Sequence, residues 1–152
     1  MGTKKELQVS AIENGTVIDH IPSDKLFDVI NVLGIERMEN AMTYGMNLHS
    51  SKLGRKAIIK IWDKFLEDEE VNKLALVAPS AKINIIRDYD VVEKKLVNVP
   101  EHVEAIVKCM NPKCITNHEH VRTKFDVVNT SPIVLRCHYC EKLTDEKHIV
   151  VI

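Results

Sequence analysis

Long apolar runs are missing from this sequence, and so are the short motifs by which many enzymes are recognised. No stretch approaches the roughly 20 consecutive apolar residues of a membrane-spanning helix. There is no glycine-rich dinucleotide motif (G-x-G-x-x-G), no phosphate-binding loop ending in Gly-Lys-Ser/Thr and no G-x-S-x-G nucleophile turn. The sequence therefore predicts neither a membrane protein nor an enzyme with its own active site.

The chain also lacks a surplus of charge of either sign. Its 21 Lys and Arg residues are matched by 22 Asp and Glu residues, and its 152 residues are 45% hydrophobic, as in one or two small globular domains. From Pro100 to the end, seven basic residues accompany seven acidic ones. A zinc ribbon that binds nucleic acid usually has a positive surplus, which neutralises phosphates. The balanced charge therefore disfavours a nucleic-acid partner.

Cysteine is scarce, and all four cysteines lie in one C-terminal stretch as two close pairs, Cys109 with Cys114 and Cys137 with Cys140. Two such pairs on tight turns, separated by a loop, are typical of a tetrahedral Zn²⁺ site. Disulfides or redox-active thiols are the alternatives. Because Met1 leads directly into a charged segment and no signal peptide is evident, we expect a cytoplasmic chain with reduced thiols. We predict one structural Zn²⁺ bound by the four cysteines.

The predicted zinc has a role in folding. The segment 100–152 is short, and a domain of this size is marginally stable on its own. A structural Zn²⁺ site contributes on the order of 10–16 kcal/mol at neutral pH, so the metal can decide whether this segment folds. A catalytic zinc normally keeps one coordination position open. Because four thiolates close the shell, we expect His118, His120 and His138 to be surface residues.

Two helices are expected in the N-terminal part. Ser23 is the predicted N-cap of the first, which carries apolar residues at helical spacing and should stop at Gly34. The second should begin at Asp68 and end before Pro79. Short apolar segments flank both helices and predict strands.

Asn14-Gly15 is the strongest turn signal in the chain, and it favours a two-residue hairpin turn between the first two strands. The predicted strands cover residues 7–12, 16–21, 42–48, 57–62, 82–87 and 91–95. This order of elements predicts an α+β fold, in which an N-terminal antiparallel sheet carries two helices on one face, as in a ferredoxin-like sandwich. A small C-terminal all-β zinc-binding domain should follow, which gives domains at 1–99 and 100–152 with a linker at 96–103.

Period-two geometry sorts the strand residues by face. In the predicted hairpin, Ile12 lies opposite Val17, and Ser10 lies opposite Asp19. One sheet face then combines apolar residues with Asp19, Lys56, Lys60, Asn84 and Lys94. Such a face suits a small anionic ligand, with lysines for phosphates and a carboxylate for a ribose hydroxyl. On the pattern alone, however, a solvated face of alternating polarity is the better interpretation.

Several strings together resemble the regulatory chain of aspartate carbamoyltransferase. They are Gly15-Thr-Val-Ile-Asp-His-Ile-Pro, Gly54-Arg-Lys, residues 84–89, Val92-Glu-Lys, Asn111-Pro-Lys-Cys-Ile-Thr-Asn and Cys137-His-Tyr-Cys-Glu-Lys. The resemblance runs in order from about residue 7 to residue 142. A zinc knuckle alone would be a common feature, whereas its combination with the Gly-Thr-Val-Ile-Asp-His string is specific.

The resemblance implies a non-catalytic regulatory subunit of an enzyme complex in pyrimidine biosynthesis. In that family the N-terminal domain binds the inhibitor CTP and the activator ATP, and it pairs with a second regulatory chain. The zinc domain docks on separate catalytic chains, which carry out carbamoyl transfer. The holoenzyme joins two catalytic trimers through three regulatory dimers. A zinc-ribbon module that binds nucleic acid is the alternative function.

The resemblance also assigns roles to residues. Asp19 and Lys60 are expected to contact the ribose, and Lys94 and His20 are expected to contact the phosphates. Lys56 matches a residue of the family that is linked to synergy with a second nucleotide, UTP with Mg²⁺. The whole implied nucleotide site comprises Ile12, Val17, Asp19, His20, Lys56, Ile58, Lys60, Asn84, Ile86, Tyr89, Val91 and Lys94. The implied contacts with the catalytic chain are Asn111, Lys113, Glu119 and Lys142. Departures from better-known members fall at Glu6 and Ser10, near the nucleotide pocket.

Overall fold

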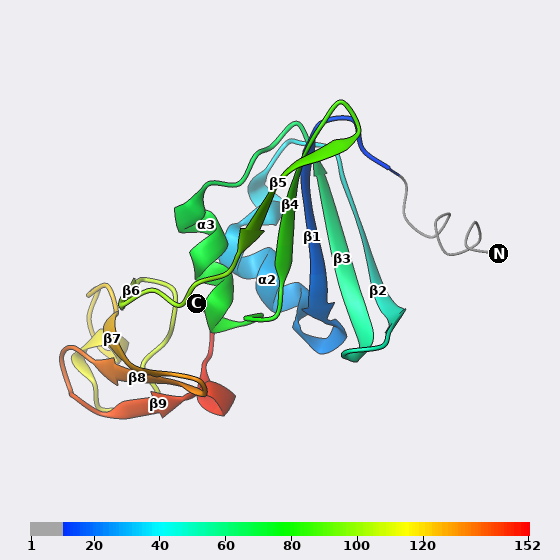
Figure 1. Cartoon of the computed structure of the whole chain (residues 1–152). Helices are drawn as coiled ribbons and strands as arrows, with labels where there is room; N and C mark the ends of the chain where they lie inside the picture. Colours follow the sequence, from blue (N-terminus) through cyan, green and yellow to red (C-terminus); the bar gives the residue numbers. More distant parts are fainter. Residues whose placement is uncertain (1–10) are drawn as a thin grey trace. The chain divides into compact units, whose positions relative to one another are not determined.

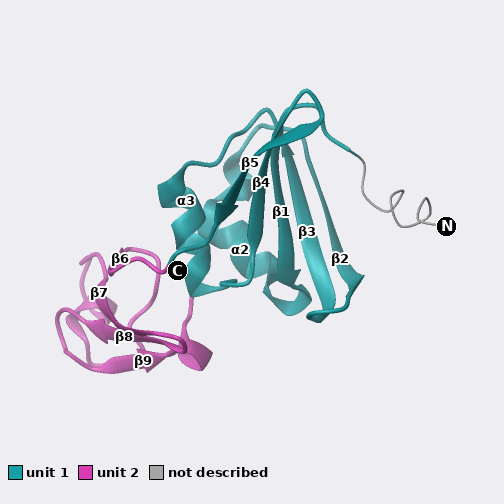
Figure 2. Ribbon diagram, viewed as in Figure 1, with its two compact units in different colours: residues 1–98 teal, residues 99–152 magenta. Residues whose placement is uncertain are grey.

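The computed structural model describes residues 11–152 and divides the chain into two compact units, residues 1–98 and 99–152 (Figure 2). Each unit has its own sheet, and none of the described helices is long and apolar enough to span a membrane. The first unit contains β1 (Gly15–Pro22), α2 (Leu26–Leu33), β2 (Met42–Ser50), β3 (Gly54–Trp62), α3 (Asp68–Lys73), β4 (Lys82–Arg87) and β5 (Asp90–Leu96).

The five strands of the first unit form one antiparallel sheet in the order β2-β3-β1-β4-β5. The two helices cover one face of it (Figure 1). Without β5, this order is that of a ferredoxin-like sandwich, so the predicted fold class is confirmed. The buried face follows the expected alternation: Ile18 lies between Ile59 and Ile83 in the ladders, and all three side chains are fully buried.

The predicted N-terminal hairpin is wrong. Both edges of β1 are occupied, because residues from Gly15 to Ile18 pair with β3 on one side and with β4 on the other. Ala11 and Ile12 belong to no strand, and the rest of the predicted first strand, Ser10 included, lies outside the described residues. The carbonyl of Asn14 accepts a hydrogen bond from the Asp63 N–H (3.0 Å), so this segment leads into the centre of the sheet.

The helix boundaries are mostly as predicted, but Ser23 is not an N-cap. It opens a short 3₁₀ turn before α2, and its hydroxyl accepts a hydrogen bond from the Asn47 N–H on β2 (2.7 Å). Gly34 ends α2 in the left-handed conformation (φ 64°), as predicted. At the start of α3 it is Glu67 that caps the helix, in a capping box with Glu70.

The second unit is all-β, as predicted. Its sheet has the order β6-β7-β8-β9 and is antiparallel throughout, with strands at β6 (His102–Glu104), β7 (Lys124–Thr130), β8 (Ile133–Cys137) and β9 (Leu143–Asp145). A small core of Val103, Phe125 and Leu135 is buried between these strands and the loops. Much of the unit consists of loops, which carry Cys109, Cys114 and Cys140, whereas Cys137 is the last residue of β8.

Candidate functional site

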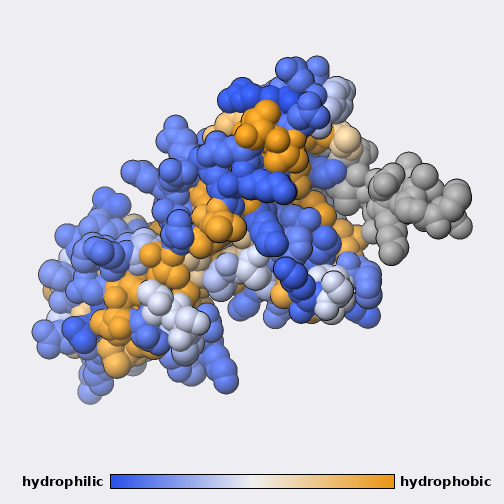
Figure 3. Space-filling view, in the orientation of Figure 1, coloured by the Kyte–Doolittle hydropathy of each residue, from blue (hydrophilic) through white to orange (hydrophobic). Residues whose placement is uncertain are grey.

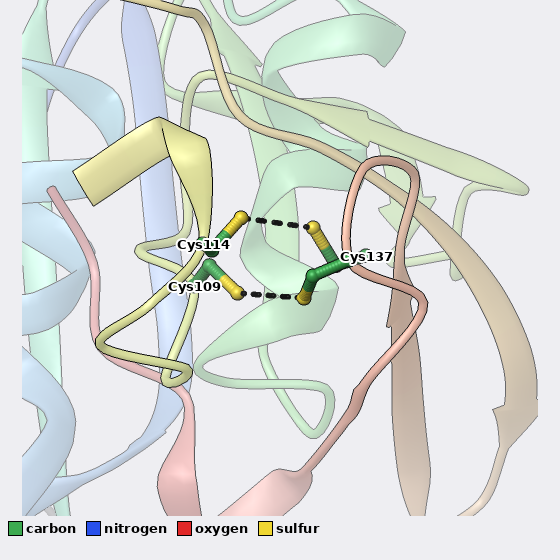
Figure 4. Close-up of side chains that lie close together, drawn as sticks. Cys109, Cys114 and Cys137 are labelled. Atoms are coloured by element: carbon green, nitrogen blue, oxygen red, sulfur yellow. Dashed lines mark hydrogen bonds between the residues drawn. The ribbon is translucent and has the colours of Figure 1, made fainter. Parts of the chain in front are cut away.

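The four cysteines converge in the second unit. Their Sγ atoms all lie within 4.8 Å of one another, with Cys109 3.6 Å from Cys140 and Cys114 3.7 Å from Cys137 (Figure 4). Four thiolates at about 2.3 Å from a tetrahedral metal ion lie about 3.8 Å apart, so the arrangement fits such an ion. Disulfide bonding requires about 2.05 Å, and all four residues are free cysteines.

Short hydrogen bonds hold the first cysteine pair in place. The Asn117 side-chain amide donates to the carbonyls of Cys109 (3.0 Å) and Asn111 (2.8 Å), which fixes the turn between the two thiols. The Thr116 hydroxyl donates to the Sγ of Cys114 (3.2 Å). Such contacts around the ligands orient the thiolates.

The thiols differ in how readily they lose a proton. Burial raises the pKa of Cys109 to about 12. Burial also acts to raise the pKa of Cys140, but hydrogen bonds from the Asn111 side chain and the Lys142 N–H bring it down to about 7. Four thiolates this close together would repel one another, and a divalent cation at their centre supplies the compensating charge.

The neighbouring histidines His118, His120 and His138 are exposed, as predicted. The metal-binding group found among the described residues consists of the four cysteines. His118, which is exposed, interacts through Nε2 with the Pro112 carbonyl (2.8 Å), and the exposed His138 ring packs edge-on against Tyr139.

The open face of the first unit carries a continuous row of residues across all five strands. In the ladders Val17 lies opposite Lys60 on one side and Asn84 on the other, Lys60 lies opposite Thr43, and Asn84 lies opposite Lys94. Four of these five residues were predicted to bind a nucleotide. Burial lowers the pKa of Lys60, and the charge of Asp19 acts against this shift, so this ammonium group lies partly out of water.

Basic side chains surround Asp19 farther along β1. The Lys56 Nζ lies 3.0 Å from Oδ1 of Asp19, and Ile58 lies between Lys56 and Lys60 on β3. Adjacent residues of a regular strand face opposite ways, but here a bulge interrupts the register after Ile18, and His20 has φ 60°. The His20 Nδ1 consequently lies 3.5 Å from Asp19 and is buried without a hydrogen-bond partner in the described structure.

The other end of the face is apolar. Ile86 and Val91 lie opposite each other on β4 and β5, and the Tyr89 N–H donates to the Glu13 carbonyl (2.9 Å), which brings the turn between these strands next to Ile12. Figure 3 shows hydrophobic surface near this end of the sheet and hydrophilic surface along the strands below it. The face therefore changes from apolar to basic along β1.

A separate hollow of about 560 Å³ lies at the β2–β3 turn, at the end of the sheet. It is lined by Pro22, Ser23, Asp24, Met46, Asn47, Leu53, Gly54 and Arg55. Its lining carries one cation and one carboxylate, so it does not offer the excess positive charge of the strand face.

One residue of the strand face is absent from the predicted set. Lys82 lies opposite Asp19 in the β1–β4 ladder, on the same face as Asn84. The signal was available, because Lys82 stands two residues before Asn84 in a predicted strand. The predicted contacts with a catalytic chain lie in loops of the second unit, where Lys113, Glu119 and Lys142 are exposed and Asn111 is half-buried; their role stays a prediction.

Comparison with known proteins agrees with both halves of this description. Residues 7–98 match the family model described as the aspartate carbamoyltransferase regulatory chain, allosteric domain, and residues 101–150 match the metal binding domain of the same chain. The chain belongs to the family of aspartate carbamoyltransferase regulatory chains. The resemblance noted in the sequence is thereby confirmed.

Curated relatives share most of the length of this regulatory chain. It is 57% identical over 149 residues to the aspartate carbamoyltransferase regulatory chain of Bacteroides fragilis, covering 98% of this chain and 97% of the relative. The corresponding chain of Pyrococcus horikoshii is 56% identical over 147 residues, with 95% and 97% covered. The chain is therefore a regulatory and not a catalytic subunit, and its four-cysteine cluster is the site of a structural metal.

Proposed function

We propose that this regulatory chain binds the nucleotide effectors CTP and ATP on the open strand face of its first unit. The observation that carries the proposal is the change along this face from an apolar end to a basic end. A nucleotide has the same polarity, with a base at one end and phosphates at the other. Effector binding then controls the activity of separate catalytic chains of aspartate carbamoyltransferase.

Different residues of the strand face contact different parts of the nucleotide. Ile12, Ile86, Tyr89 and Val91 surround the base at the apolar end, with Val17 and Ile58 beneath the middle of the ligand. Asp19 and Lys60 contact the ribose, and Asn84 offers an amide beside them. Lys94 and His20 contact the phosphates, and Lys56 lies toward a second nucleotide, UTP with Mg²⁺. Glu6 and Ser10, which bear on this second nucleotide, lie outside the described residues.

The second unit binds Zn²⁺ through Cys109, Cys114, Cys137 and Cys140, and it docks on the catalytic chain. Tetrahedral sites of four thiolates are typical of structural zinc, and reduced thiols suit a cytoplasmic protein. Asn111, Lys113, Glu119 and Lys142 form part of the docking surface, in the loops that the metal holds in place. Effectors that bind two quaternary states with different affinities shift the balance between those states.

Regulatory chains pair as homodimers, and three such dimers join two catalytic trimers. One feature of the first unit supports pairing. In the described structure β2 is an edge strand, and it exposes Tyr44 and Met46 beside the exposed Phe27, which contacts Tyr44 edge-on. A long apolar edge strand invites pairing with another chain, and a second copy would cover it.

Calorimetric titration of the metal-loaded chain with CTP and with ATP tests the nucleotide site. Lys60→Ala and Lys94→Ala should each weaken binding at least about tenfold, because each removes a charge-assisted contact. Lys95→Ala is the matched control, since Lys95 neighbours Lys94 on β5 but pairs with Asp68 of α3 on the opposite face (2.9 Å). Equal affinities in all four chains, or no binding by the native chain, would contradict the proposal.

Effector binding should be accompanied by proton uptake at His20. Burial lowers the pKa of His20; Asp19 acts to raise it, and the charges of Lys56, Lys82 and Lys52 lower it. The negative charge of a bound polyphosphate opposes the effects of burial and of the lysines, and it therefore raises the pKa of His20. The contribution of protonated His20 to effector affinity is then complete below the pKa that His20 has in the free chain. It is lost as the pH rises through the higher pKa that His20 has in the complex.

Titrations at pH 7 in buffers of different ionisation enthalpy measure this uptake. The observed binding enthalpy should depend on the buffer for the native chain and less so for His20→Gln. His49→Gln, which changes an exposed histidine on β2, should behave like the native chain. An identical buffer dependence in His20→Gln would show that this histidine does not take up the proton.

A further inference from the structure

Lys82 occupies a place on the strand face that the nucleotide site described above does not use. It is the first residue of β4 and lies opposite Asp19 on β1 and Leu96 on β5. Because it stands two residues from Asn84, its side chain projects from the same face of the sheet. Lys82 is exposed, so its ammonium group can reach a ligand on this face.

The charge of Lys82 is not compensated within the described residues. The nearest carboxylate across the ladder is Asp19, which already interacts with the Lys56 Nζ at 3.0 Å and accepts a hydrogen bond from the His20 N–H at 2.6 Å. By contrast, Lys95 on the covered face has its own carboxylate partner in Asp68. The open face thus carries more ammonium groups than carboxylates, which is the arrangement expected where an anion binds.

The position of Lys82 along the strands relates it to one part of the ligand. Three positions of β1 mark the distance along the face. Ile86, at the apolar end, lies opposite Gly15, and Lys60 lies opposite Val17, in one row with Lys94. Lys82 lies opposite Asp19. At about 3.3 Å per residue, Lys82 is about 13 Å from the apolar row along β1. The phosphates of a nucleotide extend away from the base, and the terminal ones reach farthest.

We propose that Lys82 binds the terminal phosphates of the effector, and that it thereby lets the site distinguish nucleoside triphosphates from monophosphates. The inference rests on the proposed function, because it assumes that the base lies at the apolar end. The charge of Lys82 lowers the pKa of His20, which agrees with the proposal because both side chains then lie near the same part of the ligand.

Titrations with CTP, CDP and CMP test this assignment in the full, metal-loaded chain. Lys82→Gln should weaken CTP binding about tenfold and CMP binding less than twofold, because only the triphosphate reaches the lost ammonium group. Lys82→Arg keeps the positive charge and should retain the preference for CTP. Lys73→Ala removes an exposed lysine from α3 and is the control for a general loss of positive charge.

The outcomes separate this inference from the proposed function. If the native chain binds CTP and CMP equally well, or if Lys82→Gln weakens both to the same extent, the role of Lys82 is overturned while the nucleotide site stands. If Lys73→Ala matches Lys82→Gln, the effect is one of net charge and the assignment is again overturned. If the native chain binds none of the three nucleotides, the proposed function itself fails, and the inference fails with it.

Discussion

Removal of the metal is expected to unfold the second unit, residues 99–152, while the first unit stays folded. The reason is the small size of the core around Phe125. A core of fewer than about 70 residues rarely supplies more than about 3–5 kcal/mol, whereas a structural zinc site contributes about 10–16 kcal/mol at neutral pH. Most of the folding free energy of this unit therefore comes from the metal.

The pH dependence of metal release has a definite sign. The metal binds thiolates, so protons compete with it at each ligand. Burial raises the pKa of Cys109 to about 12 in the absence of the cation, and this thiol must lose its proton when the metal binds. Lowering the pH should therefore weaken metal binding, and a given chelator concentration should remove more metal at pH 6 than at pH 8.

Two probes separate the units. The chain has a single tryptophan, Trp62, in β3 of the first unit, so its fluorescence reports on that unit alone. Chelation should leave the Trp62 emission unchanged, while the amide NMR signals of residues 99–152 collapse to random-coil positions. Cys114→Ser should behave in the same way without a chelator, and Zn²⁺ should restore the native signals only in the unsubstituted chain.

Lys113→Ala is the control for these experiments, because it changes an exposed residue between the first two ligands and leaves all four thiols in place. It should keep the dispersed amide signals of residues 99–152, which chelation should abolish. A metal-free second unit that keeps its dispersed amide signals would show that the β6–β9 core is sufficient and that the metal is not structural.

The metal site could be predicted because its determinants are local. Each cysteine pair lies on a turn that the intervening residues define, and the spacing alone brings the two thiols of a pair together. The faces of β3 could be predicted for a similar reason, since Lys56, Ile58 and Lys60 share a face in any strand. The register between strands is a different matter, because it depends on which strands pair.

The failed hairpin shows the limit of local signals. Asn14-Gly15 favours a tight turn, but Gly15 pairs with both Trp62 and Ile86, residues far away in the chain. The burial of Ile18 against β3 and β4 outweighs the local preference of one dipeptide. The same non-local pairing creates the bulge at His20, which no residue pattern indicated.

Replacing Gly15 with alanine is expected to cost the first unit at least about 3 kcal/mol. Gly15 has φ 145°, a conformation that side-chain-bearing residues rarely adopt, and an added Cβ would lie 2.0 Å from the Ile61 carbonyl oxygen. Backbone strain of this kind costs about 1–3 kcal/mol, and overpacking costs a similar amount. For a unit of this size, the loss should lower the melting temperature by about 12 °C or more.

Two other glycines provide matched controls. An added Cβ at Gly34 would meet nothing within 4 Å, so Gly34→Ala should cost only about 1 kcal/mol for its left-handed conformation (φ 64°). Gly45→Ala would make ordinary contact with Leu48 at 3.5 Å and should change stability by less than about 0.5 kcal/mol. Thermal unfolding followed by Trp62 fluorescence measures all three variants, and equal melting temperatures for Gly15→Ala and Gly45→Ala would contradict the prediction.

The expected effect of Gly15→Ala extends to the nucleotide face, because the clash can be relieved only by moving β1 away from β3. That movement separates Val17 from Lys60, which lie opposite each other two residues beyond Gly15. CTP affinity measured well below the melting temperature should therefore fall in Gly15→Ala, although no ligand contact has been removed. Unchanged affinity in a destabilised variant would mean that β1 and β3 keep their register despite the clash, and that the binding face does not depend on close strand contact at Gly15.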